Sequence, residues 1–153
     1  MIYKLLSTNN DIGPTVLRVV LGAVLFAHGA QKLLGWFGGA GIAGTMGFLN
    51  GFLHVPESLV YVVIVIEFFG GLGLIFGFLT RLGAFGIAID MIVAAALVHV
   101  KTGFFMDWGG NQKGEGYEFH LLAIAMALTI VVYGAGAASV DGIIASRSPA
   151  AGS

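Results

Sequence analysis

The sequence predicts an all-α integral membrane protein, a bundle of four spanning helices with a short interfacial or re-entrant helix between the first and second spans. One observation behind this prediction is the composition, because 58% of the 153 residues are hydrophobic and 10% are charged. Soluble globular chains carry about a quarter charged residues. The other observation is that four segments match the roughly 20 apolar residues needed to cross a bilayer. Lipid is therefore the expected solvent, and a soluble enzyme is excluded.

The four spans are expected in a single transmembrane domain that covers residues 1–153. They are placed at residues 14–34, 58–78, 82–100 and 119–138. Runs this continuous favour helices over barrel strands, because backbone polar groups in lipid must be satisfied internally. Pro14 suits the first turn of the first helix. That first run is as long as a full span, so we expect a retained helix and not a cleaved signal.

The links between the spans differ in length. Only residues 79–81 separate the second span from the third, so these two helices should be antiparallel neighbours. The longer links, 35–57 and 101–118, then gather on the opposite face, and both termini lie on the side of the short turn. In the first long link, apolar residues recur at helical spacing, at Ile42, Met46, Leu49 and Leu53. This spacing predicts a short helix that either anchors in the interface or covers a site.

Charge and cysteine content exclude several classes of partner and chemistry. No run of Lys or Arg is present, so nucleic acid is not an expected partner. The absence of cysteine excludes thiol catalysis and thiolate metal sites, so redox chemistry would need a non-covalent cofactor or a partner's cofactor. Basic residues divide almost evenly between the two faces. Counting Arg18 and discounting Lys32 as buried favours cytoplasmic termini.

Ionisable residues lie inside the apolar spans, where a charge costs about 2.5 to 3.5 kcal/mol and normally faces a partner or a cavity. Glu67 lies midway along the second span and Asp90 nearly midway along the third, at similar depth. Arg18 can reach toward either carboxylate or extend to the headgroups. One Arg cannot neutralise two acids, so one carboxyl is protonated, or Lys32 or a water-filled cavity offsets it. The residues form either a structural ionic clasp or a proton relay or ligand site.

A second polar group collects toward the long-loop face. Its members are His28, Gln31, Lys32, His99, Glu118 and His120. The first three share one helix face and can donate hydrogen bonds to the carbonyl oxygens of a quinone, with a nearby acid supplying the proton. The alternative is a set of polar residues that simply meets the membrane interface. No metal site is expected, because no pair has the spacing that puts two ligands on one helix face.

Short motifs occur in a fixed order between Arg18 and Asp141. They are Arg18-x-x-x-Gly22, Phe26-x-His28-Gly29-x-Gln31-Lys32, Glu67-x-x-Gly70-Gly71, Gly77-x-x-Thr80-Arg81, His99 before Gly103-Phe104-Phe105, Glu118, and Gly134-x-Gly136-x-x-Ser139-x-Asp141. This ordered set resembles the DoxX family. The resemblance implies a bacterial inner-membrane protein related to quinone-reducing subunits of thiosulfate oxidation and to a partner of superoxide dismutase and a sulfurtransferase. Asp90 lies outside the motif.

The resemblance and the polar residues together predict a membrane subunit of a redox or quinone-linked complex. If the chain is an enzyme, it is a quinone-linked oxidoreductase subunit. The residues expected to line a quinone pocket are Arg18, His28, Gln31, Lys32, Glu67, His99 and Glu118, with Asp90, His120, Arg81 and Asp141 as secondary candidates. Expected partners are the bilayer, redox proteins and a second copy of the chain. The alternatives are a non-catalytic scaffold subunit and a small proton-coupled transporter or channel.

Overall fold

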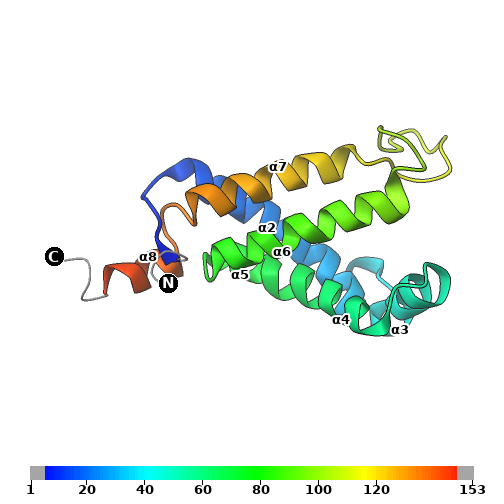
Figure 1. Cartoon of the computed structure of the whole chain (residues 1–153), viewed down its shortest axis with the longest axis horizontal. Coiled ribbons are helices and arrows are strands. Elements are labelled where there is room, and N and C mark those ends of the chain that lie inside the picture. Colours follow the sequence, from blue (N-terminus) through cyan, green and yellow to red (C-terminus); the bar gives the residue numbers. More distant parts are fainter. Residues whose placement is uncertain (1–5, 148–153) are drawn as a thin grey trace.

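The computed structural model describes residues 6–147, and the ends of the expected domain, 1–5 and 148–153, lie outside the described residues. The described part is helical throughout its regular elements and contains no strand. Its helices run along the long axis of the molecule, with the short turn after α5 at one end and the two long loops at the other (Figure 1). The expected all-α membrane bundle is confirmed.

The first span is α2 (Ile12–Leu34), which carries Pro14 in its first turn. Gly35 ends the helix in the left-handed conformation, with φ of 73°, a geometry that glycine adopts at little cost. One face of α2 buries Leu21 and Leu25 in the bundle core, whereas Val16 and Val20 on another face are about half exposed. Exposed valines on a helix of this length suit contact with lipid tails.

The second and third spans are each interrupted by a π-helical segment. The second consists of α4 (Glu57–Val65), η3 (Ile66–Gly70) and α5 (Gly71–Phe76), and the third of α6 (Thr80–Ala94) and η4 (Ala95–His99). By length and composition, residues 12–34, 57–76 and 80–99 can each cross a membrane. Insertions that produce π-helical turns are rare and often mark functional sites. Both segments carry a predicted site residue.

The first long link, in which one short helix is expected, folds into three short helical segments. They are η1 (Trp36–Gly38), α3 (Gly41–Met46) and η2 (Gly47–Phe52). These helices form a lobe beside the loop ends of α2 and α4 (Figure 1). Thr45 is buried and donates a hydrogen bond to the carbonyl of Lys32 at 3.4 Å. The lobe therefore extends the bundle past the end of α2.

The fourth span, α7 (Glu118–Tyr133), ends before the expected Ala138. Gly134 has φ of 84° and Gly136 has φ of 72°, so the chain leaves the helix and loops back before α8 (Val140–Ser146). At the rise of an α-helix, α7 is about 24 Å long, somewhat short of a hydrocarbon core about 30 Å thick. The expected boundary is wrong because hydropathy counts the apolar alanines after Gly134 as helix.

Glycines allow α2 and the second span to pack at backbone contact. A Cβ atom built on Gly29 would lie 2.3 Å from the backbone nitrogen of Phe68, and one on Gly71 would lie 2.5 Å from that of Phe26. Either contact would force the helices apart. This packing fixes the first span against η3, the segment that carries Glu67.

Candidate functional site

Polar residues inside the spans form separate clusters at different depths. Arg18 lies toward the terminal end of the bundle, and the cluster of Lys32, Glu67 and Asp90 lies near its middle. We name the second cluster the charged triad. A third cluster, the histidine group, contains His28, His99 and His120.

Arg18 is buried, with 1% of its surface exposed. Its guanidinium makes five hydrogen bonds to main-chain carbonyls, which uses all five of its N–H groups. The acceptors are Ala135 at 2.7 Å, Leu74 at 2.8 Å, Ile75 at 2.6 Å, Ala137 at 3.1 Å and Ala138 at 2.7 Å. We name this arrangement the carbonyl clasp. The expectation that Arg18 reaches a carboxylate or extends to the headgroups is wrong.

The clasp exists because helix ends leave carbonyls without partners. Leu74 and Ile75 lie in the last turn of α5, and Ala135, Ala137 and Ala138 follow the end of α7. Arg18 therefore joins α2 to two chain segments that end inside the apolar region. Its position in the bundle is structural.

Two secondary candidates, Asp141 and Arg81, also bind helix ends. The carboxylate of Asp141 accepts hydrogen bonds from the backbone nitrogens of Leu79 at 2.8 Å and Thr80 at 2.9 Å, which caps the N-terminus of α6. Arg81 donates to the carbonyls of Val131 and Val132, in the last turn of α7, and to that of Ser7. The structure thus places both side chains in contacts that hold helix termini.

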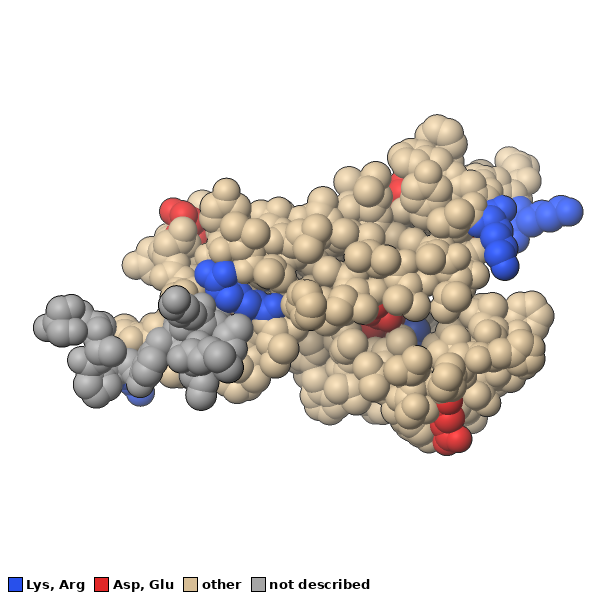
Figure 2. Space-filling view, viewed as in Figure 1, with Lys and Arg blue, Asp and Glu red and all other residues tan. Residues whose placement is uncertain are grey.

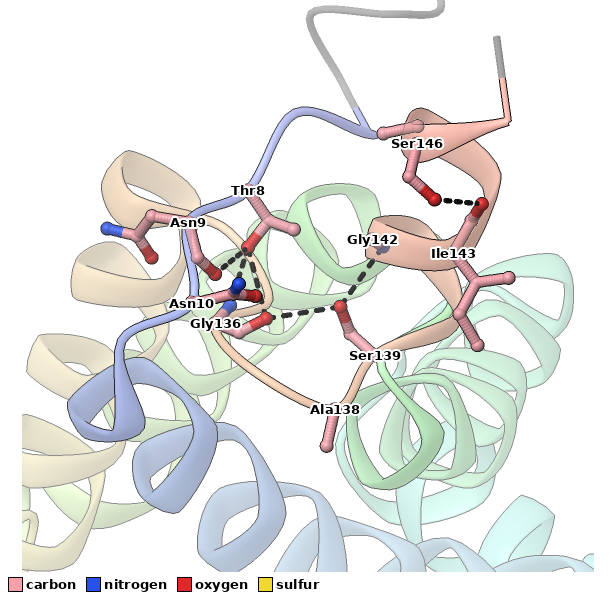
Figure 3. Close-up of a pocket in the computed structure, with 10 residues that line it drawn as sticks. Thr8, Asn9, Asn10, Gly136, Ala138, Ser139, Gly142, Ile143 and Ser146 are labelled. Carbon is pink, nitrogen blue, oxygen red and sulfur yellow. Dashed lines mark hydrogen bonds between the residues drawn. The ribbon is translucent and has the colours of Figure 1, made fainter.

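A pocket of about 530 Å³ opens beside the clasp at the terminal end. The polar groups in its wall are bonded to one another (Figure 3). Thr8 Oγ1 accepts from the nitrogen of Gly136 at 2.7 Å, and Ser139 Oγ accepts from the nitrogen of Gly142 at 3.1 Å. None of the residues predicted for the site lines this pocket. We therefore place the candidate site elsewhere, in the middle of the bundle.

The charged triad contains a short ion pair, in which Lys32 Nζ lies 2.6 Å from Glu67 Oε2. The side chains are 26% and 6% exposed, respectively. Asp90 is 6% exposed, and its charge interacts with those of Glu67 and Lys32. One ammonium group neutralises one carboxylate, and a second unpaired carboxylate in apolar surroundings is very costly. Only one of the two carboxyls is therefore paired with an ammonium group.

The triad retains hydrogen-bonding capacity, since Asp90 Oδ2 is buried and has no hydrogen-bond partner. Figure 2 shows acidic and basic atoms side by side in a recess midway along the face that it draws. Glu67 lies midway along the second span, residues 57–76, and Asp90 midway along the third, residues 80–99, so each is about 14 Å from the ends of its span.

The histidine group extends from the long-loop face toward the triad. The rings of His99 and His120 lie 4.1 Å apart between centroids. His28 lies one helical turn before Lys32 on α2. His28 is exposed on α2, whereas His120 is 7% exposed and its buried Nδ1 has no hydrogen-bond partner. Within residues 6–147, no group of three or more His, Asp or Glu side chains is arranged to hold a metal ion.

Gln31 and Glu118 contact the long loops. Gln31 Nε2 donates to the carbonyl of Phe37 at 3.3 Å. Glu118 Oε1 accepts from the nitrogen of Met106 at 3.0 Å and from Trp108 Nε1 at 3.2 Å. The structure thus pairs Lys32 with Glu67 and places His99 against His120, which the sequence ranked second. No pattern in the sequence predicted that backbone carbonyls would accept the hydrogen bonds of Arg18.

The fold and these clusters define a helical membrane protein that holds ionisable groups inside its bundle. The DoxX family model matches residues 13–100, and the chain belongs to this family. The matched region contains Arg18, the whole charged triad and His99, whereas His120 lies beyond it. The predicted family membership is confirmed.

Curated relatives cover most of the chain. "Putative oxidoreductase CatD" of Bacillus subtilis is 34% identical over 78% of this chain and 80% of its own length. "Inner membrane protein YqjF" of Escherichia coli is 28% identical over 88% of this chain and 93% of its own length. A Haemophilus influenzae protein is 30% identical over 82% of this chain and 85% of its own. No solved structure matches.

Proposed function

We propose that this protein is a membrane subunit of a redox complex and that it binds a quinone headgroup at the charged triad. The observation that carries the proposal is the ion pair of Lys32 and Glu67 at 2.6 Å, with the carboxyl of Asp90 beside it, between three apolar spans. Outside the triad, the proposed site includes the three members of the histidine group, His28, His99 and His120.

The triad differs from the structural charges of the same bundle. Arg18 has a carbonyl for each of its N–H groups, so nothing is left to bind a ligand. Asp90 retains a buried oxygen without a partner, and unsatisfied buried groups in native proteins call for an explanation. Exposure also decreases from His28 through Lys32 to Glu67. A ligand that arrives from the lipid can therefore meet His28 first and the carboxyls last.

A quinone matches this chemistry because it dissolves in lipid and carries two carbonyl oxygens that accept hydrogen bonds from an ammonium or imidazole group. Its reduction to a quinol takes up two electrons and two protons. The chain has no cysteine, so we assign the electrons to a partner redox protein, which is oxidised in the same step. One proton comes from the carboxyl pair and the other from solvent through the same site.

The relatives support the coarser part of this proposal. The B. subtilis relative carries the word oxidoreductase in its name, and the E. coli relative carries the words inner membrane. We extend these terms to this chain and propose a multi-pass protein of the bacterial inner membrane with cytoplasmic termini.

The test is quinone retention by the purified protein in lipid nanodiscs, measured by extraction and mass spectrometry. Lys32→Met removes the charged donor, which reduces affinity by about tenfold or more. Lys101→Met removes an exposed loop lysine and is the matched control. We expect wild type and Lys101→Met to retain added quinone equally and Lys32→Met to lose it, while all three stay monodisperse. Equal retention by all three, or none by wild type, would overturn the proposal.

A scaffold subunit is the second candidate, favoured by the structural contacts of Arg18, Arg81 and Asp141. These charges hold helix ends. Under this candidate, the double variant Lys32→Met with Glu67→Gln keeps its partner proteins in affinity purification and keeps full activity of the assembled complex. Under the quinone proposal, the partners remain bound but electron transfer to quinone is lost.

A further inference from the structure

The second and third spans pack closely in the half of the bundle that carries the short turn. A Cβ atom built on Gly86 would lie 3.5 Å from the side chain of Ile66. One built on Gly70 would lie 3.7 Å from the side chain of Ile87. Asp90 lies on the same face of α6, one turn beyond Gly86 and Ile87. The two spans are therefore in close contact up to the depth of Asp90.

Beyond this depth, the same faces of the two spans are exposed. Leu97 follows Asp90 by seven residues, about two helical turns, and 45% of its surface is exposed. Leu59 precedes Ile66 by the same interval on the second span and is 51% exposed. In Figure 2 the recess with the charged atoms continues from the middle of the molecule toward its long-loop end. We name this recess the lateral groove, and its walls are α4 and residues 91–99 of the third span.

The inner end of the lateral groove is polar, whereas its walls are apolar. Behind the groove lies α2 (Figure 1), which packs against α4 and α7. It carries Lys32, which pairs with Glu67 at 2.6 Å although 26% of the lysine side chain stays exposed. Asp90 adds a buried oxygen, Oδ2, without a hydrogen-bond partner. The groove therefore joins an ammonium group and a carboxyl oxygen with free capacity to walls that carry exposed leucines.

We infer that the lateral groove holds the apolar tail of the quinone whose headgroup binds the charged triad. The ligand then enters sideways, from the membrane leaflet on the long-loop side. The inference rests on the proposed function for the identity of the headgroup. The triad lies about 14 Å from the ends of its spans, inside the hydrocarbon region, so a ligand that comes through the groove comes from lipid. An amphipathic molecule matches both parts of the groove, because its headgroup meets the charges and its tail meets the leucines.

The position of the tail is a better readout than its contribution to affinity. Lipid tails are as apolar as leucine, so moving a quinone tail from lipid into the groove gains no hydrophobic free energy. The groove sets where the tail lies and which leaflet it comes from. A measurement that locates the end of the tail therefore tests the inference directly.

The experiment uses a quinone analogue with a photoreactive diazirine at the end of its tail, bound to the protein in lipid nanodiscs. After irradiation, the labelled peptides are mapped by mass spectrometry. A phospholipid that carries a diazirine in its acyl chain reports ordinary lipid contact in a parallel sample. We expect the quinone tail to label residues 57–65 and 91–99, and the phospholipid to label lipid-facing positions of every span. Quinone labels distributed like the phospholipid labels would overturn the inference.

Leu97→Trp places a larger side chain in the groove and should remove the quinone labels from residues 57–65. The matched control is Leu121→Trp, because Leu121 is 52% exposed and lies in the first turn of α7, as Leu97 lies in the last turn of the third span. This helix packs on the other side of α6 from α4 (Figure 1), so the control should keep the wild-type labels. Unchanged labels in Leu97→Trp, with both variants monodisperse, would contradict the inference.

Quinone retention measured on the same samples separates this inference from the proposed function. Retained quinone with its tail labels spread over all the spans refutes the groove and leaves the headgroup site standing. Groove labels that persist in Lys32→Met refute the headgroup site and leave the groove standing. Wild-type protein that retains no quinone refutes both.

Discussion

Removing Arg18 is predicted to destabilise the bundle more than removal of any exposed charge. Arg18→Met keeps the length of the aliphatic stem but removes all five hydrogen bonds of the clasp. The carbonyls of Ile75, Ala135 and Ala138 are left without a donor, whereas the carbonyl of Leu74 keeps the nitrogen of Gly77 and that of Ala137 keeps Thr15 Oγ1. An unsatisfied buried polar group costs about 1–3 kcal/mol. Relaxation lets some of these carbonyls find other donors, so the sum is an upper bound. We expect a loss of about 3–5 kcal/mol in the free energy of unfolding, as for removal of one partner from a buried ion pair.

The assay is reversible unfolding in mixed micelles by SDS, followed by circular dichroism. Arg147→Met, which removes an exposed arginine after α8, is the control and should lie within about 0.5 kcal/mol of wild type. Arg18→Lys keeps the charge with three donors in place of five, so its stability should fall between the two. Arg18→Met with the stability of Arg147→Met would refute the argument that the carbonyl clasp holds the ends of α5 and α7.

Other predictions concern the triad, the helix contact and the α6 cap. Lys32→Met alone should lower the free energy of unfolding more than Lys32→Met combined with Glu67→Gln does. A double-mutant cycle in the same assay should give a coupling energy of about 1–3 kcal/mol between the two side chains. A cost of the double variant equal to the sum of the two single costs would show that the pair is not coupled. Gly29→Ala should lower stability by about 2 kcal/mol or more, whereas Gly13→Ala, with open space around its Cβ position, should be nearly neutral. Asp141→Ala should cost about 1–2 kcal/mol, as loss of a helix cap does, and an unchanged melting midpoint would contradict the assigned role.

The spans, the short turn and the helix in the first long link followed from the sequence, because length and hydropathy decide them locally. The end of α7 did not. Ala135, Ala137 and Ala138 are as apolar as the helix before them, and their exit from the helix depends on a guanidinium from α2. No local pattern reports such a distant donor.

The depth of the buried carboxyls was also predictable, whereas their partner was not. Helix rise gives the depth of Glu67 and Asp90, but the direction of a side chain around the axis depends on the π-helical turn η3 and on the close contact at Gly29. Lys32 lies near the end of the first span, a position that is equally compatible with a side chain at the membrane interface. The lobe of residues 36–52 folds beside the end of α2, and Lys32 points inward to Glu67.

The central claim is that the charged triad binds a ligand and does not merely clasp the helices together. Photolabelling of the protein in native-like membranes with an azido-quinone, followed by peptide mapping, tests it most directly. We predict labels confined to the segments that carry His28, Lys32 and Glu67, displaced by unlabelled quinone and absent in Lys32→Met. Labels spread over lipid-facing positions such as Val16 and Val20, undiminished by competitor, would contradict it.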